Sequence, residues 1–146
     1  MLEVDVVGAR LAPTGMPPAE VRRLCEATAQ RLAVGAGHVA VEFVDRGRIA
    51  ELNAFHRGSA APTDVLSFPI DGQEAVRAGD GKRGPGAGAG GLASAELGDV
   101  IICPACTADV GEAIVHGMLH LLGMDHETDE GEMLALQAEL LAELRR

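Results

Sequence analysis

Three of the chain's five histidines lie within one stretch, His116 to His126, with the spacing H-x3-H-x5-H. If the first part is helical, His116 and His120 share one helix face, about 6 Å apart along the axis. Gly123 can take the left-handed conformation that ends a helix. The chain can then turn so that His126 returns to the same point in space. Three converging imidazoles, with no fourth protein ligand in view, predict an open metal site.

Neutral imidazole is a ligand that suits Zn2+, and also Ni2+, Cu2+ or iron. The ligand type alone leaves the choice among these metals open. The competing interpretation is a chance grouping of three structural histidines. The pair at i and i+4, the glycine exit and the third histidine together favour the metal site.

The same spacing, including Gly123, occurs in metzincin peptidases, whose motif is H-E-x-x-H-x-x-G-x-x-H. Position 117 is glycine here, where those enzymes carry the glutamate that acts as general base. Glycine cannot take a proton from a metal-bound water. The sequence therefore predicts the metal ligands of a zinc hydrolase and disfavours peptide hydrolysis.

The rest of the chain predicts an α+β fold with the element order β-α-β-α-β-β-α-α. We expect one mixed sheet of about four strands packed with helices, and the metal site at the end of the penultimate helix. Strands are predicted at residues 2–7, 39–44, 63–69 and 97–103. Helices are predicted at 17–33, after an Asp45 cap, at 107–122, and after an Asp129 cap.

The length of 146 residues fits a single domain spanning 1–146. Residues 71–95 contain a low-complexity run rich in glycine, which predicts a flexible insert between two strands. Acidic residues stand near the start of the chain where a signal peptide carries basic ones. With an odd number of cysteines and no membrane-spanning run, this favours a cytoplasmic protein without a disulfide scaffold.

The formal net charge of −10 disfavours nucleic-acid binding driven by charge alone. Tryptophan and tyrosine are absent and there are three phenylalanines, so base stacking on aromatic side chains is hardly available. A nucleic-acid substrate would have to be held by other means.

Four further residues are candidates for the site, each with a structural alternative. Asp125 can orient a ligand imidazole or form the turn beside it. Arg57 lies in a break between a helix and a strand, where a guanidinium can clamp a phosphate or remain a surface residue. Asp64 and Ser67 lie on or beside the predicted short strand and can line a substrate cleft or satisfy the turn.

The pair Cys103 and Cys106 forms a C-x2-C motif, which is found in redox pairs and in zinc knuckles. Its spacing from Cys25 fits a zinc knuckle poorly, and two small residues at a strand end are the simpler interpretation. His38 and His56 are predicted to be structural. His56, beside Arg57, is the one more readily placed near the site.

Four sequence blocks together resemble the YbeY family of bacterial endoribonucleases and rRNA maturation factors. They are L-N-A-F-H-R at 52–57, P-T-D-V-L-S-F-P at 62–69, L-G-D-V-I-I-C at 97–103 and H-G-M-L-H-L-L-G-M-D-H at 116–126. The similarity covers about residues 40 to 145.

The resemblance implies an enzyme that cleaves single-stranded RNA with a metal, usually zinc, held by His116, His120 and His126. We therefore expect one zinc ion per chain, with nickel or another divalent transition metal as the alternatives. It implies maturation of small-subunit rRNA ends and ribosome quality control, with rRNA, the small ribosomal subunit, its proteins or an assembly GTPase as partners. Neither DNA nor a membrane is expected. Arg57 matches an arginine that assists catalysis in the family, and we expect Arg57 and His116 to be catalytic.

The chain departs from the family pattern at several positions. Ser59 and Ala60 stand where the family usually has lysine and aspartate, which removes a positive charge near the phosphate path. Met124 replaces an aromatic residue before Asp125. Two alternatives to the endoribonuclease remain open: a metal-dependent hydrolase of another bond, and a non-catalytic ribosome-assembly factor with a structural metal.

Overall fold

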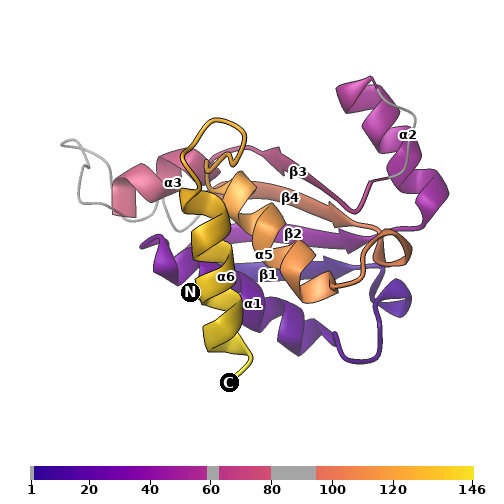
Figure 1. Ribbon diagram of the computed structural model, residues 1–146, viewed down its shortest axis with the longest axis horizontal. Coiled ribbons are helices and arrows are strands. Elements are labelled where there is room, and N and C mark those ends of the chain that lie inside the picture. Colours follow the sequence, from indigo (N-terminus) through magenta and orange to yellow (C-terminus); the bar gives the residue numbers. More distant parts are fainter. Residues whose placement is uncertain (1, 59–62, 80–94) are drawn as a thin grey trace.

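The computed structural model describes residues 2–58, 63–79 and 95–146, and only the backbone at residues 57 and 77–79. Its centre is a four-stranded mixed sheet with the strand order β1-β2-β4-β3 (Figure 1). Strands β1, β2 and β4 are parallel, and β3 runs antiparallel to β4. The strands are Leu2–Val7, Gly37–Phe43, Val65–Pro69 and Glu96–Ile102 for β1 to β4. The predicted α+β class with one mixed sheet is confirmed.

Three helices lie on one face of this sheet (Figure 1). They are α1 at Pro18–Arg31, α5 at Val110–Leu121 and α6 at Glu132–Leu144. On β2, buried and half-buried residues alternate, as period-2 patterning predicts. The buried side chains between the sheet and these helices include Leu24, Val39, Val41, Phe43, Val100, Ile114, Met118, Leu119 and Met133. This layer holds α5, and therefore its histidines, against the sheet.

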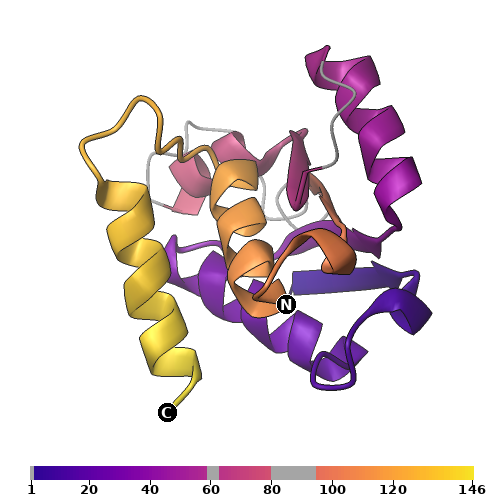
Figure 2. The same ribbon diagram turned by 45° about the vertical axis from the view of Figure 1, so that its right-hand side comes forward.

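The helix α2, Arg46–Arg57, lies apart from this layer (Figure 2). The Asp45 side chain accepts a hydrogen bond from the backbone N–H of Arg48, so the predicted N-cap is confirmed. Ile49 of α2 is fully buried in a second, smaller cluster with Leu66 of β3 and Ile101 of β4. Successive side chains of a strand point to opposite faces, so this cluster lies on the face opposite the main core. The helix α2 therefore covers the other face of the sheet at β3 and β4.

The prediction for residues 71–95 was wrong in part, because a helix forms where we expected flexible chain. The helix α3, Gly72–Gly79, follows β3 directly. Ala75 is buried and Val76 packs against the main core, which stabilises a helix that the nearby glycines obscured in the sequence. A Cβ at Gly72 would clash with the Leu121 carbonyl oxygen, so the chain here passes close to α5. The rest of the predicted insert, residues 80–94, lies outside the described residues.

Two helix starts also differ from the predictions. The helix α5 begins at Val110, because Pro104–Cys106 first forms a 3-10 turn and Asp109 then caps the helix by accepting from the N–H of Glu112. The helix α6 begins at Glu132, with Gly131 as its N-cap at φ 103°. None of the described helices is long and apolar enough to cross a membrane.

Candidate metal centre

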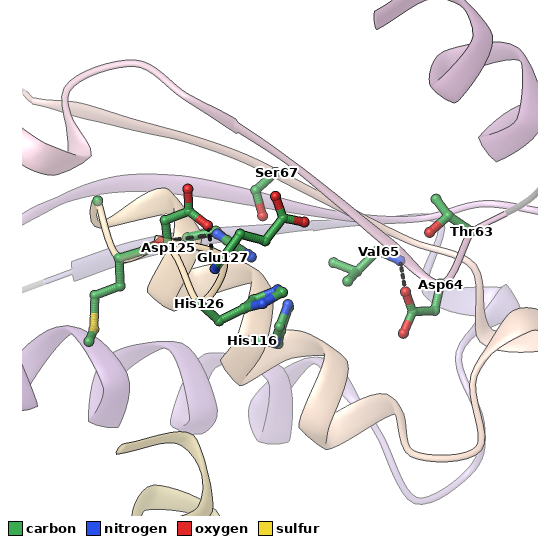
Figure 3. A pocket seen from close by; sticks show the side chains of 11 residues that line it. Thr63, Asp64, Val65, Ser67, His116, Asp125, His126 and Glu127 are labelled. Carbon is green, nitrogen blue, oxygen red and sulfur yellow. Dashed lines mark hydrogen bonds between the residues drawn. The ribbon is translucent and has the colours of Figure 1, made fainter. Parts of the chain in front are cut away.

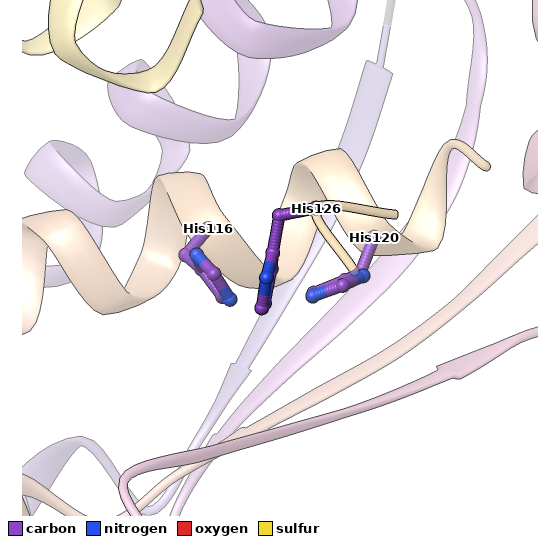
Figure 4. A group of neighbouring side chains, drawn as sticks. All are labelled: His116, His120 and His126. Carbon is purple, nitrogen blue, oxygen red and sulfur yellow. The ribbon is translucent and has the colours of Figure 1, made fainter. Parts of the chain in front are cut away.

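The three histidines of the motif converge beside the C-terminal end of α5, as predicted. His116 and His120 lie one turn apart on the helix, and Gly123, at φ 100°, reverses the chain after it. Figure 4 shows the three rings gathered on the same side of α5. One ring nitrogen from each histidine lies within 4.8 Å of the others. The ring centroids are 4.8 to 5.2 Å apart.

Two hydrogen bonds orient two of the three candidate ligand imidazoles. Nδ1 of His116 lies 2.7 Å from Oε1 of Gln137, and Nδ1 of His120 lies 2.9 Å from the carbonyl oxygen of Met124. A carbonyl oxygen only accepts, so Nδ1 carries the proton in each ring. Nε2 then keeps its electron pair for a metal. This arrangement fits a divalent transition metal. A histidine that binds a metal through one ring nitrogen typically donates the N–H of the other to an acceptor.

Sequence reasoning missed Gln137 as a partner of His116. The signal was available: Gln137 is a polar residue within the inner stripe of α6, between the buried residues Met133 and Leu140. A buried amide on an apolar face needs a hydrogen-bond partner. The partner could not be named from the sequence, because it belongs to another helix.

The site favours neutral imidazole at His120. Burial lowers the pKa of His120, and electrostatic repulsion between its charged form and the neighbouring His116 lowers that pKa further. Only the neutral ring binds a metal, so a lowered pKa reduces the competition from protons.

Gly117 lies where α5 packs closely against β3 and β4. A Cβ at Gly117 would lie 2.6 Å from Cγ1 of Val100 and 3.1 Å from Cγ2 of Val65. The hydroxyl of Ser67 donates to the Gly117 carbonyl oxygen at 2.9 Å and joins the helix to β3. The position that carries the catalytic glutamate in the peptidase motif therefore faces the sheet and has no space for a side chain.

The histidines open into a pocket of about 520 Å³ between β3 and the turn after α5. Asp64, Ser67 and Asp125 line this pocket. Their role toward a substrate or a ligand imidazole stays a prediction. Thr63 and Glu127 also line the pocket and were not predicted. Figure 3 shows Thr63 and Asp64 at the opposite end of the pocket from Asp125 and Glu127. The pocket therefore has carboxylates at both ends, and the hydroxyl group of Ser67 on β3 lines it between them.

Asp125 and Asp64 both hydrogen-bond to backbone N–H groups. Oδ1 of Asp125 accepts from the N–H of Glu127 at 3.0 Å, which is the turn-forming role that the sequence left open. Oδ1 of Asp64 accepts from the N–H of Val65 at 2.9 Å. Each carboxylate keeps further acceptor capacity toward the pocket.

The sequence family of this chain can be established by comparison with known proteins. The family model described as "Endoribonuclease YbeY" matches residues 18–145. The chain belongs to the YbeY family. Curated YbeY proteins match over most of the chain. "Endoribonuclease YbeY" of Symbiobacterium thermophilum is 36% identical over 85% of this chain and 84% of its own length.

Other YbeY relatives agree with this assignment. The protein of Salinispora tropica is 43% identical over 73% of this chain and 74% of its own length, and that of Pseudomonas putida is 35% identical over 99% and 90%. The solution structure of TM1509 from Thermotoga maritima matches the fold with a TM-score of 0.54. It covers 99% of this chain and 89% of its own chain at 23% identity, which supports the fold alone.

Arg57, which the resemblance to the YbeY family marked as catalytic, is the last residue of α2. Its side chain lies outside the described part of the structure, as do Ser59 and Ala60, so its role stays a prediction. Gly58 ends the helix at φ 74°. His56, the residue before Arg57, contacts two aromatic rings. Its ring centroid lies 4.9 Å from that of Phe55 and 4.5 Å from that of Phe68. His56 is not among the residues that line the pocket.

His38 is not among the residues that line the pocket. It lies between two carboxylates, with Nε2 2.7 Å from Oδ2 of Asp5 and Nδ1 2.7 Å from Oε2 of Glu96. The hydrogen bonds to Asp5 and then to Glu96 raise the pKa of His38. The structural role predicted for His38 is thus a bridge between β1, β2 and β4.

Proposed function

We propose that this YbeY-family protein is a metal-dependent endoribonuclease that cleaves single-stranded RNA, and that its substrate is ribosomal RNA. The observation that carries the proposal is the convergence of three imidazoles, two of which, His116 and His120, are oriented through Nδ1 by Gln137 and the Met124 carbonyl. The endoribonuclease names of the relatives support the choice of RNA.

His116, His120 and His126 would hold one divalent ion, for which zinc is the proposed identity. When bound, such an ion polarises a phosphoryl oxygen and makes a water more acidic. The chain's own residues then have three tasks: to hold the RNA backbone, to exchange protons and to balance developing charge. Asp64, Asp125 and Glu127 are the carboxylates at the pocket that can accept or return a proton.

Arg57 is the residue proposed to balance negative charge on the phosphate during cleavage. A guanidinium remains protonated at any working pH and can donate two hydrogen bonds to a phosphate. Two observations support this role for Arg57. It is the last residue of α2, and it belongs to the L-N-A-F-H-R block at 52–57, which resembles the YbeY family.

A phosphodiester is favoured over a peptide by the packing of Gly117. In the peptidase motif a glutamate at this position is the general base, and here that direction is filled by Val100 and Val65. A rotation of α5 that made room for a side chain would break the Ser67 hydrogen bond to the Gly117 carbonyl.

The acidic composition bears on how RNA is recognised. With a net charge of −10, the free protein has little general attraction for RNA. We infer that affinity comes from docking on the small ribosomal subunit, through its proteins or an assembly GTPase, in the cytoplasm. Roles in maturation of small-subunit rRNA and in ribosome quality control follow from this docking.

The test uses the full chain purified without a histidine tag. Metal content is measured by mass spectrometry, and cleavage is measured on a labelled single-stranded RNA, the same RNA in a duplex, casein, and small ribosomal subunits carrying unprocessed rRNA. The variants are His116→Ala and Arg57→Ala. His38→Gln is the matched control, since it removes a histidine outside the pocket.

We expect about one metal per chain and cleavage of single-stranded RNA that is lost in His116→Ala together with the metal. Arg57→Ala should keep the metal and lose cleavage, and His38→Gln should keep both. Unchanged RNA cleavage by His116→Ala would show a contaminating nuclease. Cleavage of casein but not RNA would establish a peptidase. A metallated protein that binds small subunits and cuts neither would be an assembly factor.

A further inference from the structure

The two cysteines of the C-x2-C motif lie in contact at the end of β4. Sγ of Cys106 donates to Sγ of Cys103, and the two sulfur atoms are 2.9 Å apart. The segment Pro104–Cys106 forms a 3-10 turn that starts at Cys103, and the N–H of Cys106 donates to the Cys103 carbonyl at 3.0 Å. The backbone therefore brings both thiols to one point.

The two thiols differ in their surroundings. Cys103 is fully buried in the smaller hydrophobic cluster, beside Ile49 and Leu66, whereas Cys106 is only partly buried. Burial, and then the hydrogen bond from Cys106, raise the pKa of Cys103. A reagent in solution thus meets Cys106 first, while Cys103 lies directly behind it.

A structural zinc site does not account for this pair. Within residues 2–58, 63–79 and 95–146, only His116, His120 and His126 form a group of three or more side chains at metal-binding distance. A closed zinc site needs four ligands. The remaining cysteine, Cys25, is buried in α1, and burial raises its pKa to about 12.

We propose that Cys103 and Cys106 are a dithiol–disulfide site that reacts reversibly with low-molecular-weight disulfides such as glutathione disulfide. The thiolate of Cys106 attacks one sulfur of glutathione disulfide, forms a mixed disulfide and releases one glutathione thiolate. The thiolate of Cys103 then attacks the Cys106 sulfur and releases the second. Two cysteine thiols are oxidised to one disulfide, one glutathione disulfide is reduced to two glutathiones, and the two protons pass to the leaving thiolates.

The contacts of the turn place this site beside the metal pocket. The N–H of Cys103 donates to the Asp64 carbonyl at 2.9 Å, and Asp64 lines that pocket. Nη2 of Arg46 donates to the Ala105 carbonyl at 2.9 Å, which ties the start of α2 to the same turn. Oxidation would therefore occur where β4, α2 and the pocket wall meet.

The experiment equilibrates the full, metal-loaded chain, without oxygen, in buffers of increasing ratio of oxidised to reduced glutathione. The reaction is stopped with acid, free thiols are alkylated in denaturant, and the intact mass is measured. Trypsin cleaves after Arg23, Arg31 and Arg83, so Cys25 is recovered on a different peptide from the pair. The variants are Cys106→Ser and Cys103→Ser, and Cys25→Ser is the matched control.

In wild type and in Cys25→Ser, we expect Cys103 and Cys106 to become resistant to alkylation together as the glutathione ratio rises. The unalkylated pair should then carry two hydrogen atoms fewer than the reduced pair, as a disulfide does. Cys103→Ser should stop at one glutathione bound to Cys106. Cys106→Ser should form neither product on Cys103, because that thiol is buried. Each variant's circular dichroism is recorded; should Cys103→Ser not fold, wild type and Cys106→Ser still decide the outcome.

Two results would overturn the proposal. The first is full alkylation of both cysteines in wild type at every glutathione ratio. The second is a wild type that accumulates the Cys106 mixed disulfide without closing the bond to Cys103.

Discussion

Oε1 of Gln137 lies 2.7 Å from Nδ1 of His116, although the two residues belong to different helices and are 21 positions apart. This contact joins the packing of α6 to the chemistry of the metal centre. It holds the His116 ring in the tautomer that presents Nε2 to a metal.

Gln137→Leu should weaken metal binding by about 10- to 100-fold, the usual effect of removing the acceptor behind a ligand histidine. Leucine has a similar volume and suits the buried position, so α6 should stay packed. Affinity is measured by competition with a chelator. Gln137→Glu is the matched variant, since it keeps an acceptor oxygen and should bind at least as tightly as Gln137→Leu. Equal affinity in wild type and Gln137→Leu would remove Gln137 from the site.

Gly117→Ala should destabilise the fold by about 1–3 kcal/mol, the usual cost of inserting a methyl group into a packed core. The new Cβ would lie 2.6 Å from Cγ1 of Val100, a buried and rigid side chain. Urea unfolding of the metal-free protein measures this free energy. Gly35→Ala is the control, because a Cβ there has no neighbour within 4 Å and the change should be nearly neutral. Equal stability of the two variants would contradict the close contact.

His38 should make the protein more stable at mildly acidic than at alkaline pH. Hydrogen bonds to Asp5 and Glu96 raise its folded-state pKa, so its contribution is fully present below the unfolded value of about 6.5 and is lost as pH rises through the folded pKa. The pair is partly exposed, which limits the effect to below about 1 kcal/mol. Unfolding free energies of wild type and His38→Gln are compared from pH 6 to 9, without metal. A gap that widens toward pH 9 would refute this assignment.

Asp109 and Arg145 should show the opposite dependence. Nη2 of Arg145 lies 2.6 Å from Oδ1 of Asp109, the N-cap of α5, and this hydrogen bond lowers the pKa of Asp109. A lowered pKa stabilises above the unfolded value of about 3.9, and the gain is lost as pH falls through the folded pKa. Arg145→Gln should therefore be less stable than wild type at pH 6, and the difference should shrink toward pH 2 and in high salt. Arg146→Gln removes the same charge one residue along and should not reproduce this.

Much of the fold could be predicted because its signals are local. The strands β1 and β2 alternate in polarity, and Asp45 caps α2 as its position before an apolar helix stripe indicates. The helix α3 could not be predicted in the same way. It is short, glycine stands at both ends, and its stability comes from Ala75 and Val76 packing on the distant core.

The sequence by itself determined which three histidines converge as candidate metal ligands. His116 and His120 share a face through helix periodicity, and Gly123 supplies the turn that returns His126, so local geometry was sufficient. Only the tertiary structure decided how those ligands are held and what surrounds them. The partner of His116 comes from α6, the contact at Gly117 comes from β3 and β4, and the contact between Cys103 and Cys106 depends on a 3-10 turn at the sheet end. Such contacts depend on how elements pack, and no periodicity along a single element records that.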